Sequence, residues 1–354
     1  MDANGLMGVV VADTACSRVD GERGELVIAG YNVEDLAGHA PFEAVVDLLW
    51  EGALSDGRAR RASLGAARVR AAERLPALRG ALSHPDGMVA LRGAIGALDE
   101  ADPEALLAAV GVCWAAWMRR RLGQEPVAPD PALGHAADLL RMGAGGGGPA
   151  ADALDAYLVT VMDHGLNAST FTARVVASTG SDAVSAVVAA LGALKGPLHG
   201  GAPGPVLDML DAVGAPERAD AWIHSELQSG RRIMGMDHRI YRVRDPRASV
   251  LEAAISRLAA AGVAGDRLAL ARAVEASAEA ALAAHRPDRP LKCNVEFYTA
   301  VLLDAVGLPR EAFTPTFAVG RAAGWLAHID EQRRTGKLVR PDSRYIGPEP
   351  RARA

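Results

Sequence analysis

The sequence has few cysteines, no long uncharged apolar run and no excess of positive charge. Its three cysteines, Cys16, Cys113 and Cys293, are scattered, so neither a disulfide framework nor metal-ligand spacing is visible, and we expect no metal site. No stretch of the 354 residues approaches the roughly 18 apolar residues of a membrane span, and the start does not resemble a secretory signal. The net charge of −5 gives no reason to expect binding to nucleic acid or to a membrane surface. We therefore expect a protein of the reducing cytoplasm.

Helical periodicity and the start and stop signals of helices dominate the rest of the chain. Apolar residues recur at helical spacing in residues 42–52, 88–121 and 154–161, while GAGGGGPAA at 143–151 predicts a loop. Further helix starts are predicted by capping residues and prolines: Ser181 for a helix through Leu194, Pro205, Asp245-Pro246, and Asn294 for a helix that stops near Gly307.

Only two segments favour β-strands. They are the valine-rich residues 8–12 and residues 24–30 (GELVIAG), which we expect to form a short N-terminal hairpin. There is no internal repeat, no βαβ alternation and no GxxxxGK[ST] phosphate-binding loop. The predicted fold class is mainly α.

The first motif that could carry chemistry is KGPLHGGA at 195–202. Three glycines around His199 leave space for close approach of a ligand, and the start of the following helix disfavours an imidazolium. A neutral imidazole there could donate a hydrogen bond to a developing enolate oxygen. On this spacing alone, an incidental histidine in a flexible turn explains the motif equally well.

The second motif is MGMDHRIYRVRDPR at 234–247. Arg247 falls in the first turn of a capped helix, and a guanidinium beside a helix N-terminus makes a carboxylate site. Six arginines between Arg231 and Arg247 suit an anionic ligand. A solvated basic surface is the alternative, but it explains poorly why this charge adjoins apolar residues such as Ile233.

Three weaker signals stand further apart. Glu296 in NVEFY lies in the first turn of its helix, where an acid often only complements the helix dipole. His164 in DHGLNAST precedes a glycine and, alone, would be a helix-end residue. Arg321 and Arg340, taken alone, are typical of a protein surface.

In this order, however, the motifs are highly specific, and the chain resembles the citrate synthase family, which includes 2-methylcitrate synthases. The resemblance covers nearly the whole chain, from about residue 5 to residue 348. It is carried by GVVVADTACSRVDGERGELVIAGYNVEDLA, GLNASTFTARVVAST, ALKGPLHGGAP, DHRIYRVRDPRA, NVEFY, FAVGRAAGWLAH and LVRP. NVEFY and LVRPDSRYIGP look closest to a bacterial second-type citrate synthase.

The resemblance implies a mostly helical homodimer whose chain forms two domains. A large domain would comprise residues 1–214 and 323–354, and a small domain, residues 215–322, would be inserted into it. The cleft between them would close on the substrates and exclude water. No cofactor is implied, because acetyl-CoA and oxaloacetate are both substrates.

The resemblance also implies the catalytic roles. Glu296 would remove a methyl proton from acetyl-CoA, and His199 would stabilise the resulting enol or enolate. His238 would polarise the oxaloacetate carbonyl and protonate the new alkoxide. Hydrolysis of citryl-CoA would then release citrate and CoA.

The remaining motif positions imply binding roles. Oxaloacetate is a dianion, and its carboxylates would be held by arginines and a histidine. The implied oxaloacetate ligands are His164, Arg247 and Arg321, with Arg340 reaching the site of the partner subunit and Arg242 or Arg244 meeting the CoA phosphates.

Three positions depart from the family pattern. Glu296 stands where an aspartate is usual, Asp237 replaces the usual glycine before His238, and Ala29 stands where an arginine is common. The extra methylene moves the carboxylate by about 1.5 Å, and a misplacement of about 1 Å can cost ~100-fold in rate. Three hypotheses therefore stay open: a citrate synthase, a 2-methylcitrate synthase that accepts propionyl-CoA, and a weakly active or non-catalytic paralogue that binds metabolites or assembles with a partner.

Overall fold

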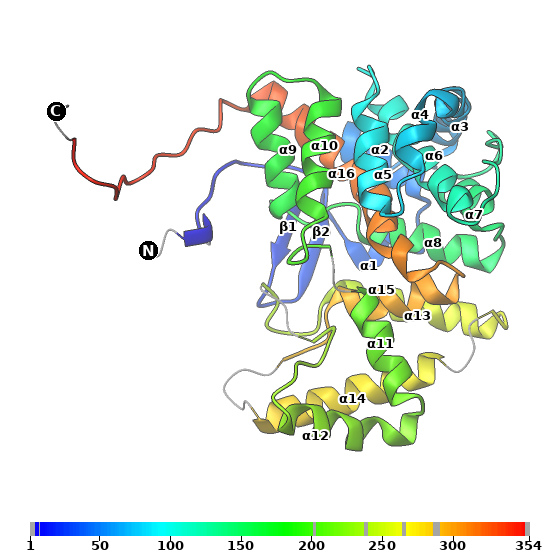
Figure 1. The fold of residues 1–354 in the computed structure, drawn as a ribbon, viewed down its shortest axis with the longest axis vertical. Coiled ribbons are helices and arrows are strands. Elements are labelled where there is room, and N and C mark those ends of the chain that lie inside the picture. The colour runs from blue at the N-terminus through cyan, green and yellow to red at the C-terminus, as the bar shows by residue number, and fades with distance from the viewer. Residues whose placement is uncertain are drawn as a thin grey trace.

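The computed structural model describes residues 4–6, 8–200, 203–236, 240–263, 267–285 and 291–350. Within them the chain forms sixteen α-helices and one small sheet, which confirms the mainly α class. Figure 1 shows an upper lobe of many helices and a smaller lower lobe. No helix of the described residues is long and apolar enough to cross a bilayer.

The upper lobe is built around α16 (Phe313–Thr335), which packs against α5, α6, α8, α9 and α10. Nearly every residue in the first four turns of α16 is buried, as expected for a helix at the centre of a bundle. The helices around it are α2 (Phe42–Glu51), α3 (Arg58–Ala72), α4 (Leu75–Leu82), α5 (Gly87–Gly96), α6 (Pro103–Arg121), α7 (His135–Ala144), α8 (Pro149–Thr160), α9 (Ala168–Ser178) and α10 (Ala183–Leu194).

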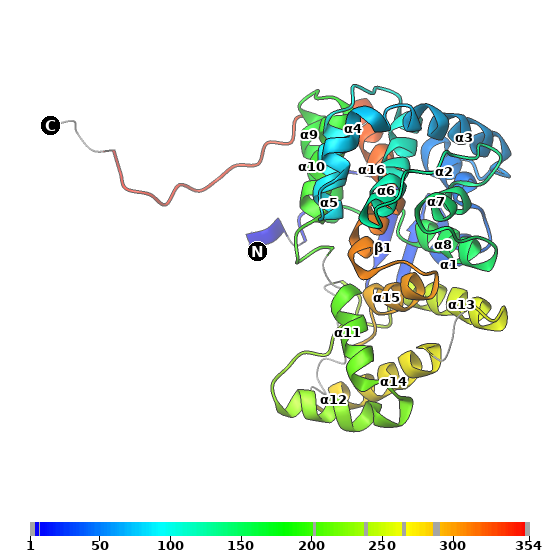
Figure 2. The same ribbon diagram turned by 45° about the vertical axis from the view of Figure 1, so that its right-hand side comes forward.

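The lower lobe meets the upper one mainly through two of its helices. α13 and α15 pack against each other and both contact α8, and α11 also contacts α16, whereas α12 and α14 lie further out (Figure 2). The bounds are α11 (Pro203–Val213), α12 (Ala219–Gln228), α13 (Pro246–Ala260), α14 (Arg267–His285) and α15 (Val295–Ala305). The predicted domain limits fall after α11, which packs on α15, and inside α16, and they remain a prediction.

A small antiparallel sheet near the N-terminus is confirmed, with β2 (Glu25–Ile28) inside the predicted segment 24–30, but the partner of this strand is not the predicted one. The strand order is β1 (Ser17–Asp20), β2 and β3 (Tyr31–Asn32), all antiparallel, followed by the short α1 (Val33–Leu36). The prediction of a strand at 8–12 is wrong, because those residues form no strand and Val10 is 85% exposed. β2 pairs instead with β1, since Asp20 closes a tight turn by accepting from two backbone N–H groups within it.

Most of the predicted helix signals are confirmed, and some boundaries shift. Gly52 ends α2 in the left-handed conformation, and Asp245 and Asn294 cap α13 and α15. The run 88–121 is two helices, because Asp102 caps a new helix that begins at Pro103. The other corrections are Asp182 rather than Ser181 as the cap of α10, Pro203 rather than Pro205 as the start of α11, and a loop at 145–148 that is shorter than predicted.

The last described residues, 336–350, have no regular secondary structure. They extend away from the body, on the side from which the N-terminal segment also leaves (Figures 1 and 2). Three large apolar side chains of this segment are strongly exposed: Leu338 at 59%, Tyr345 at 74% and Ile346 at 87%.

Ala29 provides a test of backbone strain in the sheet. It forms the two-residue turn between β2 and β3 with Gly30, and both have positive φ, 44° and 96°. An L-residue with a Cβ is disfavoured there by about 1 kcal/mol relative to glycine. We expect Ala29→Gly to raise the free energy of unfolding by ~0.5–1 kcal/mol in urea titrations.

The same substitution in a helix is the control. Ala62 is an exposed residue inside α3, so Ala62→Gly should lower the free energy of unfolding by about 1 kcal/mol. If both variants lose stability to the same extent, the turn at Ala29 is not strained.

Candidate active site

Five of the predicted site residues lie where the two lobes meet. His164 follows α8, His199 follows α10, Arg247 and Glu296 stand in the first turns of α13 and α15, and Arg321 lies in α16. Electrostatic influence links four of them: Arg321 acts on the pKa of both His199 and Glu296, and Arg247 acts on the pKa of both Glu296 and Arg321.

Asp245 places Arg247 beside Glu296. Its carboxylate caps α13 by accepting from the Arg247 N–H at 3.0 Å, and it pairs with the same side chain at 3.0 Å from Nε and 2.7 Å from Nη2. The Val295 N–H, in the first turn of α15, also donates to this carboxylate, at 3.2 Å. Asn294 caps α15 by accepting from the Glu296 N–H at 3.0 Å. Two helix N-termini therefore meet at one buried acid.

Arg321 and Arg247 form the positively charged part of the site. Both are buried, and Arg321 is fixed by donating from Nε to the Val161 carbonyl at 2.5 Å, with its guanidinium 4.6 Å from the centre of the Phe317 ring. Burial lowers the pKa of Arg321 to about 10; the charge of Asp163 opposes that change and the charge of Arg247 adds to it. Two guanidinium groups that repel each other in a buried place favour a ligand with two negative charges.

Glu296 has the electrostatic properties of a general base. Burial raises the pKa of its carboxyl from 4.5 to about 7, with Arg247 and Arg321 opposing the rise and Asp245 adding to it. Its side chain is partly exposed to solvent, so a substrate could reach it. A carboxyl with a pKa near neutrality can accept a proton from a weak carbon acid and later release it.

His199 is held as a neutral imidazole. Burial, followed by the charge of Arg321, lowers its pKa to about 4. Its Nε2 lies 2.8 Å from the hydroxyl and 3.3 Å from the backbone N–H of Ser169, in the first turn of α9, and Trp325 donates to the same hydroxyl at 3.1 Å. With Nε2 engaged by Ser169, Nδ1 is the ring nitrogen left to meet a ligand.

His164 adjoins the arginines through a shared aromatic neighbour. Its Nε2 lies 3.1 Å from the Tyr241 hydroxyl, and the two rings meet edge to face with centroids 5.7 Å apart. The guanidinium of Arg247 lies 5.9 Å from the centre of the same tyrosine ring. A buried imidazole, a phenol and a guanidinium thus share one side of the site.

The other predicted residues that the structure describes, Arg242, Arg244 and Arg340, are not part of this group. His238 and its neighbour Asp237 lie outside the described residues. Arg340 is exposed on the extended C-terminal segment. Arg242 is also exposed, while Arg244 already pairs with Glu252 and Glu275, at 2.7 Å each, so a CoA phosphate would have to compete with two carboxylates for it.

The structure adds residues that sequence reasoning did not identify. Ser169 and Trp325 orient His199 but lie 30 and 126 positions from it, so no local pattern connects them. Asp245 was visible as a helix cap, whereas its contact with α15, 50 residues later, was not.

Among the described residues, only one group has the spacing of metal ligands. It comprises Cys16, His328 and Glu331, whose ligand atoms lie within 4.8 Å of one another. Arg174 already donates to Glu331 and contacts His328 there. Burial raises the pKa of the Cys16 thiol to about 12, and metals bind the thiolate. The chemistry of this group fits a hydrogen-bond network better than a metal centre.

Comparison with known proteins identifies the family. The family model described as "Citrate synthase, C-terminal domain" matches residues 5–342. A citrate synthase of Haloferax volcanii is 38% identical over 97% of this chain and 95% of its own length, and 2-methylcitrate synthase 2 of Corynebacterium glutamicum is 36% identical over 98% and 95%. A putative citrate synthase 2 of Mycobacterium tuberculosis is 51% identical, but that match spans 57% of this chain and only 52% of the relative.

Solved structures agree in fold. The crystal structure of citrate synthase from Thermotoga maritima superposes with a TM-score of 0.87 at 31% identity, covering 100% of this chain and 98% of the other. Citrate synthase from Pyrobaculum aerophilum gives 0.88 at 32% identity, covering 99% and 94%. On the sequence match and the fold together, the chain belongs to the citrate synthase family.

Proposed function

We propose that this protein is a citrate synthase, which condenses acetyl-CoA with oxaloacetate and water to give citrate and CoA. One observation carries the proposal: two buried guanidinium groups lie close to a carboxyl with a pKa near 7 and to a neutral imidazole. The reaction needs these groups, namely a cationic site for a dicarboxylate, a base for the thioester methyl and a donor for the enolate oxygen.

In this proposal Arg247, Arg321 and His164 bind oxaloacetate. The guanidiniums pair with its two carboxylates, and the dianion relieves the repulsion between them. Because both arginines are fixed by protein contacts before the substrate arrives, little side-chain entropy is lost on binding.

Glu296 and His199 would then act on the acyl-CoA. The Glu296 carboxylate takes a proton from the methyl group while His199 donates a hydrogen bond from Nδ1 to the thioester oxygen. The enolate carbon attacks the oxaloacetate carbonyl, and the alkoxide takes its proton from His238, a role that rests on the family motif alone. Water hydrolyses the thioester of citryl-CoA and gives citrate and CoA.

The proposed chemistry also uses the predicted division into two domains. In our proposal the part of the predicted small domain that precedes α16, residues 215–312, moves against the large domain so that the cleft closes over both substrates. Glu296 belongs to the small domain and His199 to the large one. Closure would therefore bring the base and the hydrogen-bond donor together around the acyl group.

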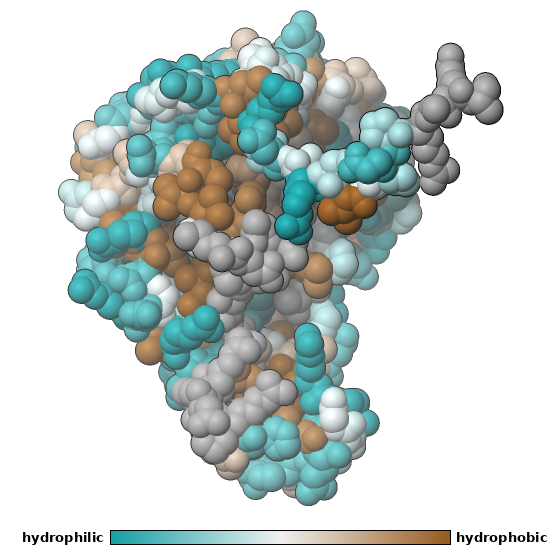
Figure 3. Space-filling view, turned by 90° about the vertical axis from the view of Figure 1, so that its left-hand side faces the viewer, coloured by the Kyte–Doolittle hydropathy of each residue, from teal (hydrophilic) through white to brown (hydrophobic). Residues whose placement is uncertain are grey.

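We also propose that the protein is a homodimer. α10 contains no charged residue, and its outward positions, among them Val188, Ala189 and Gly192, are apolar or small and only half-buried. A helix that is apolar on all sides is normally covered on all sides. Figure 3 shows apolar patches on the upper lobe, on the side from which residues 336–350 leave the body.

Arg340 fits this assembly. It is exposed on the C-terminal segment, residues 336–350, which extends away from the body (Figure 1). We propose that it completes the site of the partner subunit. The three cysteines are buried and unpaired, which supports a cytoplasmic location.

The two alternatives keep a specific basis. The relative from Corynebacterium glutamicum is named a 2-methylcitrate synthase, and Glu296, the proposed base, carries one methylene more than the aspartate that is usual in the family. A weakly active or non-catalytic paralogue would keep the arginine site without turnover.

Release of the CoA thiol tests all three readings. We expect release from acetyl-CoA only when oxaloacetate is present, and a kcat/KM for acetyl-CoA about 10-fold or more above that for propionyl-CoA, since one methylene in a pocket is worth ~10–200-fold. A ratio below one would identify a 2-methylcitrate synthase. An intact dimer that releases no thiol with either substrate at any pH would favour the non-catalytic paralogue.

The pH profile tests Glu296 as the base. A carboxyl with its pKa at about 7 is protonated below that pH and cannot accept a proton, so kcat/KM should fall on the acid side with an apparent pKa near 7. His199 stays neutral down to about pH 4 and should not contribute to this limb.

Glu296→Gln supplies the matched variant. It should abolish turnover and leave oxaloacetate binding nearly unchanged. The raised pKa means that the ionised carboxylate destabilises the folded protein as the pH rises through 4.5 to 7, so the variant should gain in Tm over wild type at pH 8 and not at pH 4. Glu311→Gln, an exposed acid outside the site, should change neither property. Wild-type turnover in Glu296→Gln would remove Glu296 from the base role.

A charge on α10 tests the dimer. A side chain at Gly192 would meet open space within the protomer, so Gly192→Glu should fold normally and yet place a charge on the proposed interface. We expect light scattering to report a monomer, with reduced turnover because the partner's Arg340 is lost. Gly80→Glu, at an equally open helical position on α4, should remain dimeric and active. A dimeric Gly192→Glu would move the interface elsewhere.

A further inference from the structure

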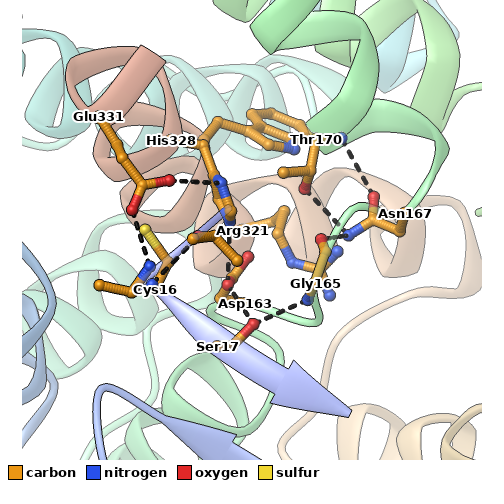
Figure 4. A network of polar contacts seen from close by, with 12 residues as sticks. Cys16, Ser17, Asp163, Gly165, Asn167, Thr170, Arg321, His328 and Glu331 are labelled. Atoms are coloured by element: carbon orange, nitrogen blue, oxygen red, sulfur yellow. Dashed lines mark hydrogen bonds and ion pairs between the residues drawn. The ribbon is translucent and has the colours of Figure 1, made fainter. Parts of the chain in front are cut away.

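Behind His164 a single hydroxyl contacts both sequence neighbours of this residue. Ser17 Oγ, in β1, donates to Asp163 Oδ2 at 2.5 Å and accepts from the Gly165 N–H at 2.8 Å (Figure 4). His164 lies between these two anchored neighbours, and Gly165 takes the left-handed conformation with φ of 57°. The turn that presents His164 is therefore tied to the N-terminal sheet.

The second partner of Asp163 is His328 in α16. His328 Nε2 lies 3.1 Å from Asp163 Oδ2, and its Nδ1 lies 3.0 Å from Nη1 of Arg174. A guanidinium can only donate, so Nδ1 must accept and Nε2 must carry the ring proton. His328 is thus a neutral bridge that donates to Asp163 and accepts from Arg174.

Arg174 is in turn held by three groups from α16. It donates from Nη1 to Glu331 at 2.5 Å and from Nε to Gln332 at 2.9 Å, in addition to its contact with His328. Glu331 also accepts from the Ala15 N–H at 2.8 Å. These links join the N-terminal segment, α9 and α16 in one buried network (Figure 4).

Through Asp163 the network reaches Arg321, one of the two buried arginines of the site. Asp163 is fully buried, and its Oδ1 has no hydrogen-bond partner among the described residues. The negative charge of Asp163 stabilises the Arg321 guanidinium against the effect of burial on its pKa. One side of this carboxylate is therefore fixed by Ser17 and His328, while its charge acts on Arg321.

We propose that His328 and Ser17 are positioning residues for oxaloacetate, which act through Asp163 to set the places of His164 and Arg321. The inference rests on the proposed function, because it takes these two residues as oxaloacetate ligands. Buried ion pairs add little net stability and often stabilise less than apolar side chains of similar volume, so stability alone gives weak grounds for this network. The network contacts the neighbours of His164 and places a negative charge near Arg321. Apolar side chains could not provide this charge or these hydrogen bonds.

Substitutions at His328 test the proposal. His328→Leu removes both bonds, and we expect the Kd of oxaloacetate, measured by calorimetry, to rise about tenfold or more, as for ligand groups displaced by a fraction of an ångström. The KM for acetyl-CoA at saturating oxaloacetate should change by less than about twofold. In His328→Gln the amide can donate to Asp163 and accept from Arg174, so oxaloacetate binding should return to within about threefold of wild type.

Two further variants keep the result interpretable. Thr316→Val removes another buried hydrogen-bonding group of α16, which contacts Trp114 and the Ala312 carbonyl, and should lower Tm without changing the Kd of oxaloacetate. If His328→Leu does not fold, Ser17→Ala removes the hydroxyl behind His164 with a smaller perturbation and should also weaken oxaloacetate binding.

The outcomes distinguish the proposed function from the positioning role. If wild type does not bind oxaloacetate, the proposed function fails and the positioning role fails with it. If wild type binds while the folded His328→Leu or Ser17→Ala variant binds equally well, the proposed function stands and the positioning role is overturned. An equal loss of binding in Thr316→Val would overturn the positioning role, because it would show that the network only stabilises the fold.

Discussion

The site depends on the carboxylate of Asp245. This fully buried acid would be strongly unfavourable if it were unpaired, and instead it accepts from two backbone N–H groups and from the side chain of Arg247. The backbone donors are the orphan N–H groups at the starts of α13 and α15, so a single charge satisfies both helices and sets their relative position. Arg247 and Glu296 themselves lie in these same first turns. The geometry of the anion site and of the base therefore has one common origin.

The balance of burial and charge around Glu296 explains why the pKa of its carboxyl lies near 7. Burial alone would keep the carboxyl protonated, and the two arginines alone would keep it ionised, while Asp245 weakens their effect. The result is a group that can exchange a proton near pH 7. Oxaloacetate would add negative charge to the same place and move the balance toward the protonated acid, so the bound dianion would make the carboxylate a stronger base toward the methyl group.

The sequence predicted those parts of the site that depend on local rules. The caps at Asp245 and Asn294 fix where α13 and α15 begin, and both were visible because capping needs only the next few residues. The strand at 8–12 was predicted wrongly, because the valines indicate strand preference but not a partner, and the turn at Asp20 gave that partner to β1. Ser17, Ser169 and His328 were not visible as site residues. Each contacts its partner across 30 to 165 positions, and no pattern of spacing reports such a contact.

The spacing along α16 nevertheless carries part of the missing information. Arg321, Gly324 and His328 stand at i, i+3 and i+7, so they share one face of the helix, which lies against the segment between α8 and α9. Arg321 reaches the Val161 carbonyl and His328 reaches Asp163, while a Cβ at Gly324 would lie 2.1 Å from the Met162 carbonyl oxygen. The glycine is the condition for the close approach, and the close approach lets two side chains of one helix hold Val161 and Asp163, at the start of the same loop. A rigid helix at the centre of the upper lobe thus transmits its own fixed position to the loop that presents His164.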